Sequence, residues 1–85
     1  MFRLDRLDRH FSLIGRMAKT VGIDPVRQMA VGHIAPETWR GAVLNCSGCD
    51  AADTCDAWLE AHEDGAPATP DYCRNADLFA RLGQV

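Results

Sequence analysis

Residues 46–73 read CSGCDAADTCDAWLEAHEDGAPATPDYC, and this stretch contains all four cysteines of the 85-residue chain. Three of them, Cys46, Cys49 and Cys55, follow a C-x2-C-x5-C spacing, and the fourth is Cys73. A domain of this size has a small hydrophobic core and often depends on a metal, on disulfides or on a partner subunit for its stability. We therefore predict that the four cysteines form one site around which the fold is organised.

The sequence before this stretch predicts helices. Apolar residues recur at steps of three and four through residues 3–21, from Leu4 and Leu7 through Phe11 to Val21. This spacing places them on one face of a helix, which we expect to be buried.

Two shorter helices are expected between residues 24 and 46. Asp24 and Pro25 suit the N-cap and the first position of one helix, in which Val26 could face inward. Pro36 begins the next helix, which carries Cys46 at the inner edge of its last turn. Gly48 is expected to let the backbone wrap tightly after that helix ends.

Two further helices are expected after Cys49. Asp50 or Asp53 could cap the first of them, which would direct Cys55 inward. A loop rich in glycine and proline follows, and Asn75 could cap the last helix. Strand-like alternation is missing, so we predict an all-α single domain over residues 1–85.

This domain is expected to be a small bundle of four to five short helices, with a four-cysteine metal site between the C-terminal helices. The N-terminal helices would occupy residues 1–30, and the cysteine-containing helical region would occupy residues 31–85.

The charge distribution limits the partners. Residues 1–30 carry six basic and three acidic side chains, whereas residues 31–85 carry three basic and nine acidic ones. Nucleic-acid binding requires a clustered positive surface, and none surrounds the cysteines, so we expect no nucleic-acid partner. We expect a protein partner. The helix over residues 3–21 could dock an acidic partner or a second copy, so the chain is predicted to be a monomer or a homodimer through that helix.

The hydropathy pattern argues against a membrane protein. The sequence contains no run of 18 or more apolar residues, so it predicts no transmembrane helix. Charged residues throughout the first twenty positions would interrupt the apolar part of a signal peptide, so we expect a cytoplasmic protein. In a reducing cytoplasm, clustered cysteines are more often metal ligands or redox groups than structural disulfides.

Two kinds of metal centre fit four cysteines. A [4Fe-4S] cluster is a cube that needs thiolates at four separate corners, and the C-x2-C-x5-C loop with the remote Cys73 could supply them. Zinc is the alternative, because four thiolates bind it tetrahedrally, although only Cys46 and Cys49 form the usual C-x2-C pair. Trp39, Trp58 and Tyr72 could shield either centre from water.

A thiol–disulfide redox protein is the second alternative. It would use Cys46 and Cys49 as a C-x-x-C pair, but such pairs normally open a helix, whereas this one follows a helix. His62 could lie near the site, as it shares a helix face with Cys55, while His10 has no evident partner. No catalytic constellation is visible, and four protein ligands leave no open metal position, so we expect no enzyme activity.

The ligand spacing is similar to that of several iron–sulfur proteins: oxygen-sensing regulators of the fumarate–nitrate type, WhiB-like proteins and helix-hairpin-helix DNA glycosylases. This resemblance covers about ten residues and implies a cluster, not a shared fold.

The chain as a whole resembles a family of small alphaproteobacterial proteins with four cysteines and no assigned function. The resemblance rests on the segment Met17–Gly22, on a C-x2-C-x5-C-x2-W-L core that ends at Leu59, and on Tyr72-Cys73-Arg74-Asn75. Proline is common in the family where this sequence has Arg74. The resemblance supports one four-cysteine site and implies no activity.

Overall fold

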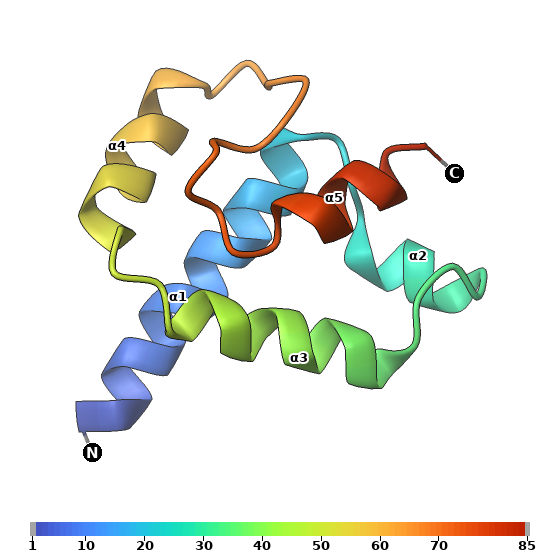
Figure 1. Cartoon of the computed structure of the whole chain (residues 1–85), viewed down its shortest axis with the longest axis horizontal. Helices are drawn as coiled ribbons and strands as arrows, with labels where there is room; N and C mark the ends of the chain where they lie inside the picture. Colours follow the sequence, from blue (N-terminus) through green and yellow to red (C-terminus); the bar gives the residue numbers. More distant parts are fainter. Residues whose placement is uncertain (1, 85) are drawn as a thin grey trace.

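The computed structural model describes residues 2–84, with side chains from residue 8 onward, and these residues form an all-α domain without strands. Five helices follow one another along the chain (Figure 1): α1 (Phe2–Thr20), α2 (Pro25–Ala30), α3 (Pro36–Ser47), α4 (Ala52–Ala61) and α5 (Ala76–Leu82). The predicted fold class is therefore confirmed, and each expected helix is present.

Helix α1 is the element on which the others assemble, because both α3 and α4 pack against it. Its buried residues recur at the three- and four-residue steps of one helical face: His10, Leu13, Ile14, Met17 and Ala18. Leu4 and Leu7, which we expected on this face, lie outside the described side chains.

The expectation for Phe11 was wrong. Its side chain is 56% exposed, whereas the neighbouring His10 is only 2% exposed. Successive residues of a helix point about 100° apart, so burial of His10 turns Phe11 towards solvent. The buried face of α1 therefore includes the polar residue His10, whereas the apolar pattern had predicted Phe11 there.

The remaining core comes from the other helices. Ala42 of α3, Leu59 of α4 and Phe79 of α5 are buried, together with Leu78 and Leu82. The ring of Trp39 meets that of Phe79 edge to face at a centroid distance of 6.5 Å, which joins α3 to α5. These contacts place the C-terminal helix against α3.

Two ion pairs join the outer sides of α1 and α4. Arg9 Nη2 lies 2.6 Å from Asp53 Oδ1, and Arg16 Nη1 lies 2.8 Å from Asp56 Oδ1. The hydrogen bond to Asp53 is the main reason why the pKa of Arg9 is raised. Asp53 was expected as a helix cap, but Ala51 occupies the N-cap position of α4 and neither Asp50 nor Asp53 makes a capping bond there.

Helix α2 begins where we predicted, but its side chains do not pack as we predicted. The Asp24 carboxylate accepts a hydrogen bond from the Arg27 backbone N–H, and Pro25 occupies the first helical turn. However, no residue of α2 is buried, and Val26 is 71% exposed. The inward orientation expected for Val26 was therefore wrong.

The loop between α4 and α5 is fastened to the end of α1. Gly65 has a φ of +107°, a conformation that glycine adopts readily, and Ala66 N–H donates to the Thr20 carbonyl at 2.9 Å. Beyond this contact the chain runs back across the molecule to the start of α5 (Figure 1). Among the described residues, no helix is long and apolar enough to cross a membrane.

Candidate metal centre

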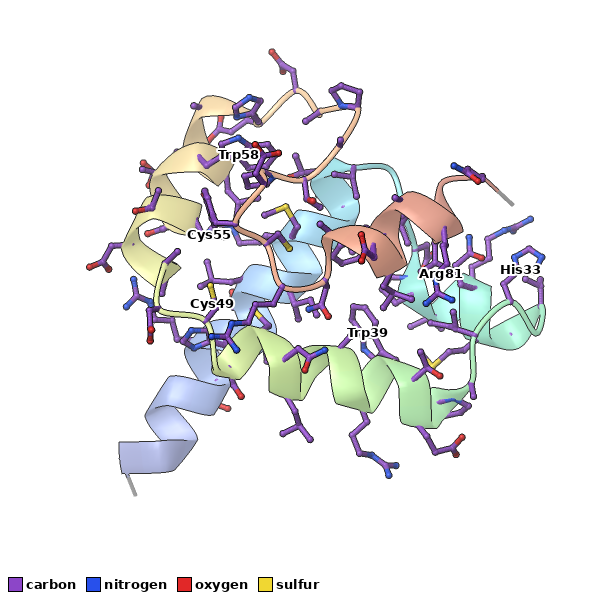
Figure 2. The ribbon with its side chains drawn as sticks, viewed as in Figure 1. His33, Trp39, Cys49, Cys55, Trp58 and Arg81 are labelled. Carbon is purple, nitrogen blue, oxygen red and sulfur yellow. The ribbon has the colours of Figure 1, made fainter. Side chains whose placement is uncertain are left out.

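The four cysteines come from different parts of the fold and line one cavity. Cys46 lies in the last turn of α3, Cys49 in the connection to α4, Cys55 on α4, and Cys73 just before α5. Figure 2 shows Cys55 on α4 and Cys49 on the neighbouring α3–α4 connection. The structure thus brings together residues that are up to 27 positions apart.

The walls of this cavity are mostly apolar. Four of the lining side chains come from the hydrophobic core of α1 and α5: Leu13, Ile14, Met17 and Phe79. The cavity volume is about 30 Å³. Pockets for organic ligands have volumes of roughly 300–1,000 Å³. The space is therefore much smaller than a pocket for an organic ligand.

The thiols lie within electrostatic range of one another. Burial, together with smaller contributions from negative charge on Cys55, Cys73 and Cys49, raises the pKa of Cys46 to about 11. Burial likewise raises the pKa of Cys55 to about 11, with added contributions from Cys73 and Cys49. Free thiols at these two positions therefore stay protonated at neutral pH.

Two of the sulfur atoms accept hydrogen bonds. The Ala51 backbone N–H donates to Cys49 Sγ at 3.4 Å. Burial raises the pKa of Cys73, and hydrogen bonds from the Asn75 backbone and from the Thr69 side chain act in the opposite direction. Donors to sulfur stabilise a thiolate, which is the form that binds metal.

His10 is a site residue that sequence reasoning missed. Its Nε2 lies 3.3 Å from the Cys49 carbonyl oxygen, and the Cys46 thiol donates to the His10 carbonyl oxygen at 3.5 Å. A carbonyl can only accept, so Nε2 carries the proton in the contact with Cys49. The only sequence signal was a histidine beside an apolar helical stripe.

Asn75 also has a role that the sequence did not reveal. It occupies the N-cap position of α5, as predicted, but its side chain makes no capping bond. Instead, this buried amide donates to the Ala42 carbonyl of α3 at 2.8 Å and accepts a longer contact from Asn45 at 3.4 Å. The start of α5, and with it Cys73, is thereby fixed against α3.

The aromatic shield is smaller than expected. Tyr72 lines the cavity, whereas Trp39 and Trp58 do not. Trp39 packs against Phe79, and Trp58 stacks on His62 at a centroid distance of 4.1 Å. His62 therefore contacts α4 itself rather than the cavity, and its Nδ1 lies 2.7 Å from the Trp58 carbonyl.

One further expectation concerns the turn between Cys46 and Cys49. Gly48 has a φ of −86°, so the turn between Cys46 and Cys49 does not use the conformational freedom of glycine. A side chain there would meet the guanidinium of Arg74, which also lines the cavity. His33 lies far from the labelled cysteines, beyond α2, where it pairs with Gln28 (Figure 2).

The metal itself stays a prediction. None of the four cysteines forms a disulfide in the structure. Within the described part of the chain, no group of three or more His, Cys, Asp or Glu side chains is arranged as the ligands of one metal ion. What the structure does provide is a shared cavity, apolar walls and hydrogen-bond donors to two of the four sulfurs.

Comparison with known families gives one result. The family model described as a family of unknown function, DUF6455, matches residues 1–85. The chain belongs to this family. No curated protein and no solved structure shows significant similarity to the chain. DUF6455 membership confirms the expected relationship to a small family without an assigned function and carries no activity with it.

Proposed function

We propose that this DUF6455 protein is a small cytoplasmic protein that carries one [4Fe-4S] cluster on Cys46, Cys49, Cys55 and Cys73 and uses it for electron transfer or for sensing oxygen, nitric oxide or redox state. The observation that carries the proposal is the convergence of four thiols from separate elements on one small, apolar-walled cavity. Apolar surroundings restrict water, and hydrogen bonds to sulfur tune the potential of such clusters.

The separate origins of the four cysteines support a cluster, because its ligands would approach from several directions. α3, the α3–α4 connection, α4 and the segment before α5 each contribute one cysteine. Metal binding requires the four thiols to lose their protons. The positive charge of the metal then stabilises the thiolates, which the metal-free site does not do. The protein would then hold four fixed sulfur ligands with no open position for hydrolysis.

A zinc-stapled interaction module is the alternative, and the same four thiols support it. In that reading the basic face of α1 would bind a partner. Two of its cations, Arg9 and Arg16, are already paired with Asp53 and Asp56. This internal pairing reduces the positive surface available to a partner and makes the alternative weaker.

The thiol–disulfide alternative has less support. A reactive cysteine needs a lowered pKa, which a helix N-terminus or a nearby cation commonly provides. Burial instead raises the pKa of Cys46 and Cys55 to about 11. Cys46, one member of the C-x-x-C pair, is therefore a poor nucleophile at neutral pH.

The acidic residues of the C-terminal half suit a basic protein partner. Exposed carboxylates lie on α4 and on the following loop, at Glu60, Glu63, Asp64 and Asp71. A redox partner with a complementary positive surface would be attracted to this side of the protein. Self-association through the outer face of α1, where Phe11 is exposed, is the second arrangement to test, by light scattering of the loaded protein.

Purification without oxygen, followed by visible absorption and by iron, zinc and sulfide analysis, tests the proposal. A broad brown absorption with about four iron and four sulfide per chain supports the cluster. Cys55→Ala should abolish loading, while Thr54→Ala, at an exposed neighbouring position, should leave it intact. Colourless protein with one zinc per chain would favour the alternative, and the absence of both metals would refute the site.

A further inference from the structure

His10 is the one buried histidine of the described chain, and it contacts both members of the C-x2-C pair. It belongs to α1, more than thirty residues before these cysteines. Its imidazole reaches the backbone of Cys49, and its own backbone meets the side chain of Cys46. One residue of α1 therefore holds both ends of the turn from Cys46 to Cys49.

The two contacts respond differently to metal binding. The Cys46 contact uses the thiol hydrogen, which is lost when this sulfur becomes a ligand, so the contact belongs to the metal-free protein. The contact from His10 Nε2 uses an imidazole N–H and the Cys49 carbonyl. Neither group changes when sulfur binds metal, so this contact persists in both forms.

The position of the Cys49 sulfur depends on this backbone contact. Cys49 lies in the irregular connection between α3 and α4, outside both helices. With only 2% of His10 exposed, water has little access to the imidazole. Loss of the donor would leave the turn less restrained, because the hydrogen bond that ties the Cys49 carbonyl to α1 would be lost.

The geometry points to His10 as a positioning residue for the metal centre: its Nε2–H fixes the Cys46–Cys49 turn so that both sulfurs face the shared cavity. The role rests on the proposed function for the identity of the bound group, but the positioning of the turn exists before any metal binds. It gives α1 a direct part in assembling a site whose ligands all come from later in the chain.

Side chains of different reach test this role. Gln places an amide N–H near the position of Nε2, whereas Asn carries the same amide but is too short, and Phe fills the volume without a donor. The test compares His10→Gln, His10→Asn and His10→Phe with His33→Phe, a change at an exposed histidine remote from the cysteines.

The first measurement uses reduced, metal-free full-length protein. Alkylation rates at each cysteine are followed by mass spectrometry after digestion. We expect Cys49 to react about fivefold faster in His10→Phe and His10→Asn, the change in local opening that one lost hydrogen bond produces, with Cys55 unchanged. His10→Gln should restore the rate, and His33→Phe should match the parent protein.

The second measurement uses protein reconstituted with iron and sulfide. Loss of visible absorption in air should be faster in His10→Phe and His10→Asn than in His10→Gln, and the reduced cluster should give a changed electron paramagnetic resonance spectrum. Equal Cys49 reactivity in all variants would overturn the role of His10. A uniform rise at all four cysteines that Gln does not reverse would also overturn it, since it would show general loosening.

The two proposals fail separately. If the parent protein never binds a cluster, the proposed function fails while the Cys49 alkylation result still decides the positioning role. If the parent binds a cluster and His10→Asn behaves as His10→Gln, the metal centre stands and the positioning role is refuted. Should His10→Phe not fold, the Asn and Gln pair alone provides the comparison.

Discussion

The side-chain amide of Asn75 donates a 2.8 Å hydrogen bond to the backbone carbonyl of Ala42, across 33 positions of sequence. Asn75 is 4% exposed and Ala42 is 3% exposed, so the bond is made out of contact with water. It fixes the first residue before α5 to the middle of α3. Since Cys73 lies two residues before Asn75 and Cys46 four residues after Ala42, this bond sets the separation of two cysteines.

Asn75→Asp should therefore destabilise the protein while keeping the shape of the side chain. The carboxylate cannot donate to Ala42, and a buried acceptor left without its donor costs about 1–3 kcal/mol. Urea unfolding of the reduced, metal-free protein at neutral pH measures the loss. Gln84→Glu, the same amide-to-carboxylate change at an exposed position outside this network, should cost about 0.5 kcal/mol or less. Equal losses for both variants would contradict the role assigned to the Ala42 bond.

The raised thiol pKa values predict a stability that falls at alkaline pH. In the unfolded chain, cysteine has its ordinary pKa of 9.0, whereas Cys46 and Cys55 titrate near 11 in the folded protein. Their contribution is complete below pH 9. Between pH 9 and 11 the unfolded chain releases protons that the folded protein retains, so the folded state is progressively disfavoured.

Urea midpoints of the reduced, metal-free protein between pH 8 and 11 measure this loss. Replacing one of the two thiols, as in Cys55→Val, should make the decline shallower, because one fewer group titrates differently in the two states. A midpoint that stays constant through this range would show that the thiols are not desolvated. A decline that Cys55→Val leaves unchanged would assign it to other groups.

Two glycines should respond to alanine in opposite directions. Gly15 lies within α1, is exposed, and has no atom within 4 Å of the position that a Cβ would occupy. Gly15→Ala should stabilise the protein by about 0.5–1 kcal/mol, because alanine loses less backbone entropy in a helix.

Gly65→Ala should instead destabilise the protein by about 1 kcal/mol, because its φ of +107° strains any L side chain. The two variants carry the same chemical change, and thermal unfolding compares them directly. Stabilisation by both would indicate that the loop around Gly65 adopts another conformation and that the contact from Ala66 to Thr20 is not needed.

The fold could be predicted well from the sequence because its signals are local. Proline and the Asp24 cap mark helix starts, and glycine marks several ends, so each expected helix is present. The orientation of α1 was harder to predict. Apolar periodicity favoured Phe11 for the core, whereas the structure exposes Phe11 and buries His10, which contacts Cys49.

The candidate ligands of the site could be predicted from the sequence, but the residues that surround them could not. Cysteine spacing alone named four residues, and the structure places all four around one cavity. The roles of His10 and Asn75 depend on contacts between residues more than thirty positions apart, which no local pattern encodes. The prediction that Trp39 and Trp58 shield the site was wrong for the same reason. Both lie close in sequence to Cys46 and Cys55, but neither lines the cavity.

Metal loading should stabilise the C-terminal half more than the N-terminal half. The segment 46–73 has few regular helical bonds outside α4, and its loop is held to α1 by the Ala66–Thr20 contact. Four metal–sulfur bonds would join α3, the α3–α4 connection, α4 and the segment before α5, because folding and metal binding are coupled. Amide hydrogen exchange with mass spectrometry, on loaded and metal-free protein, measures the difference by segment.

We expect slower exchange on loading in peptides that cover residues 47–54 and 69–75, and little change in α2, which lies away from the cavity and has no buried residue. Removal of the metal by a chelator should return both segments to their former rates. Protection spread evenly over all five helices would mean that the metal stabilises the whole fold rather than the region of its ligands, and no protection would mean that the cysteines do not hold it.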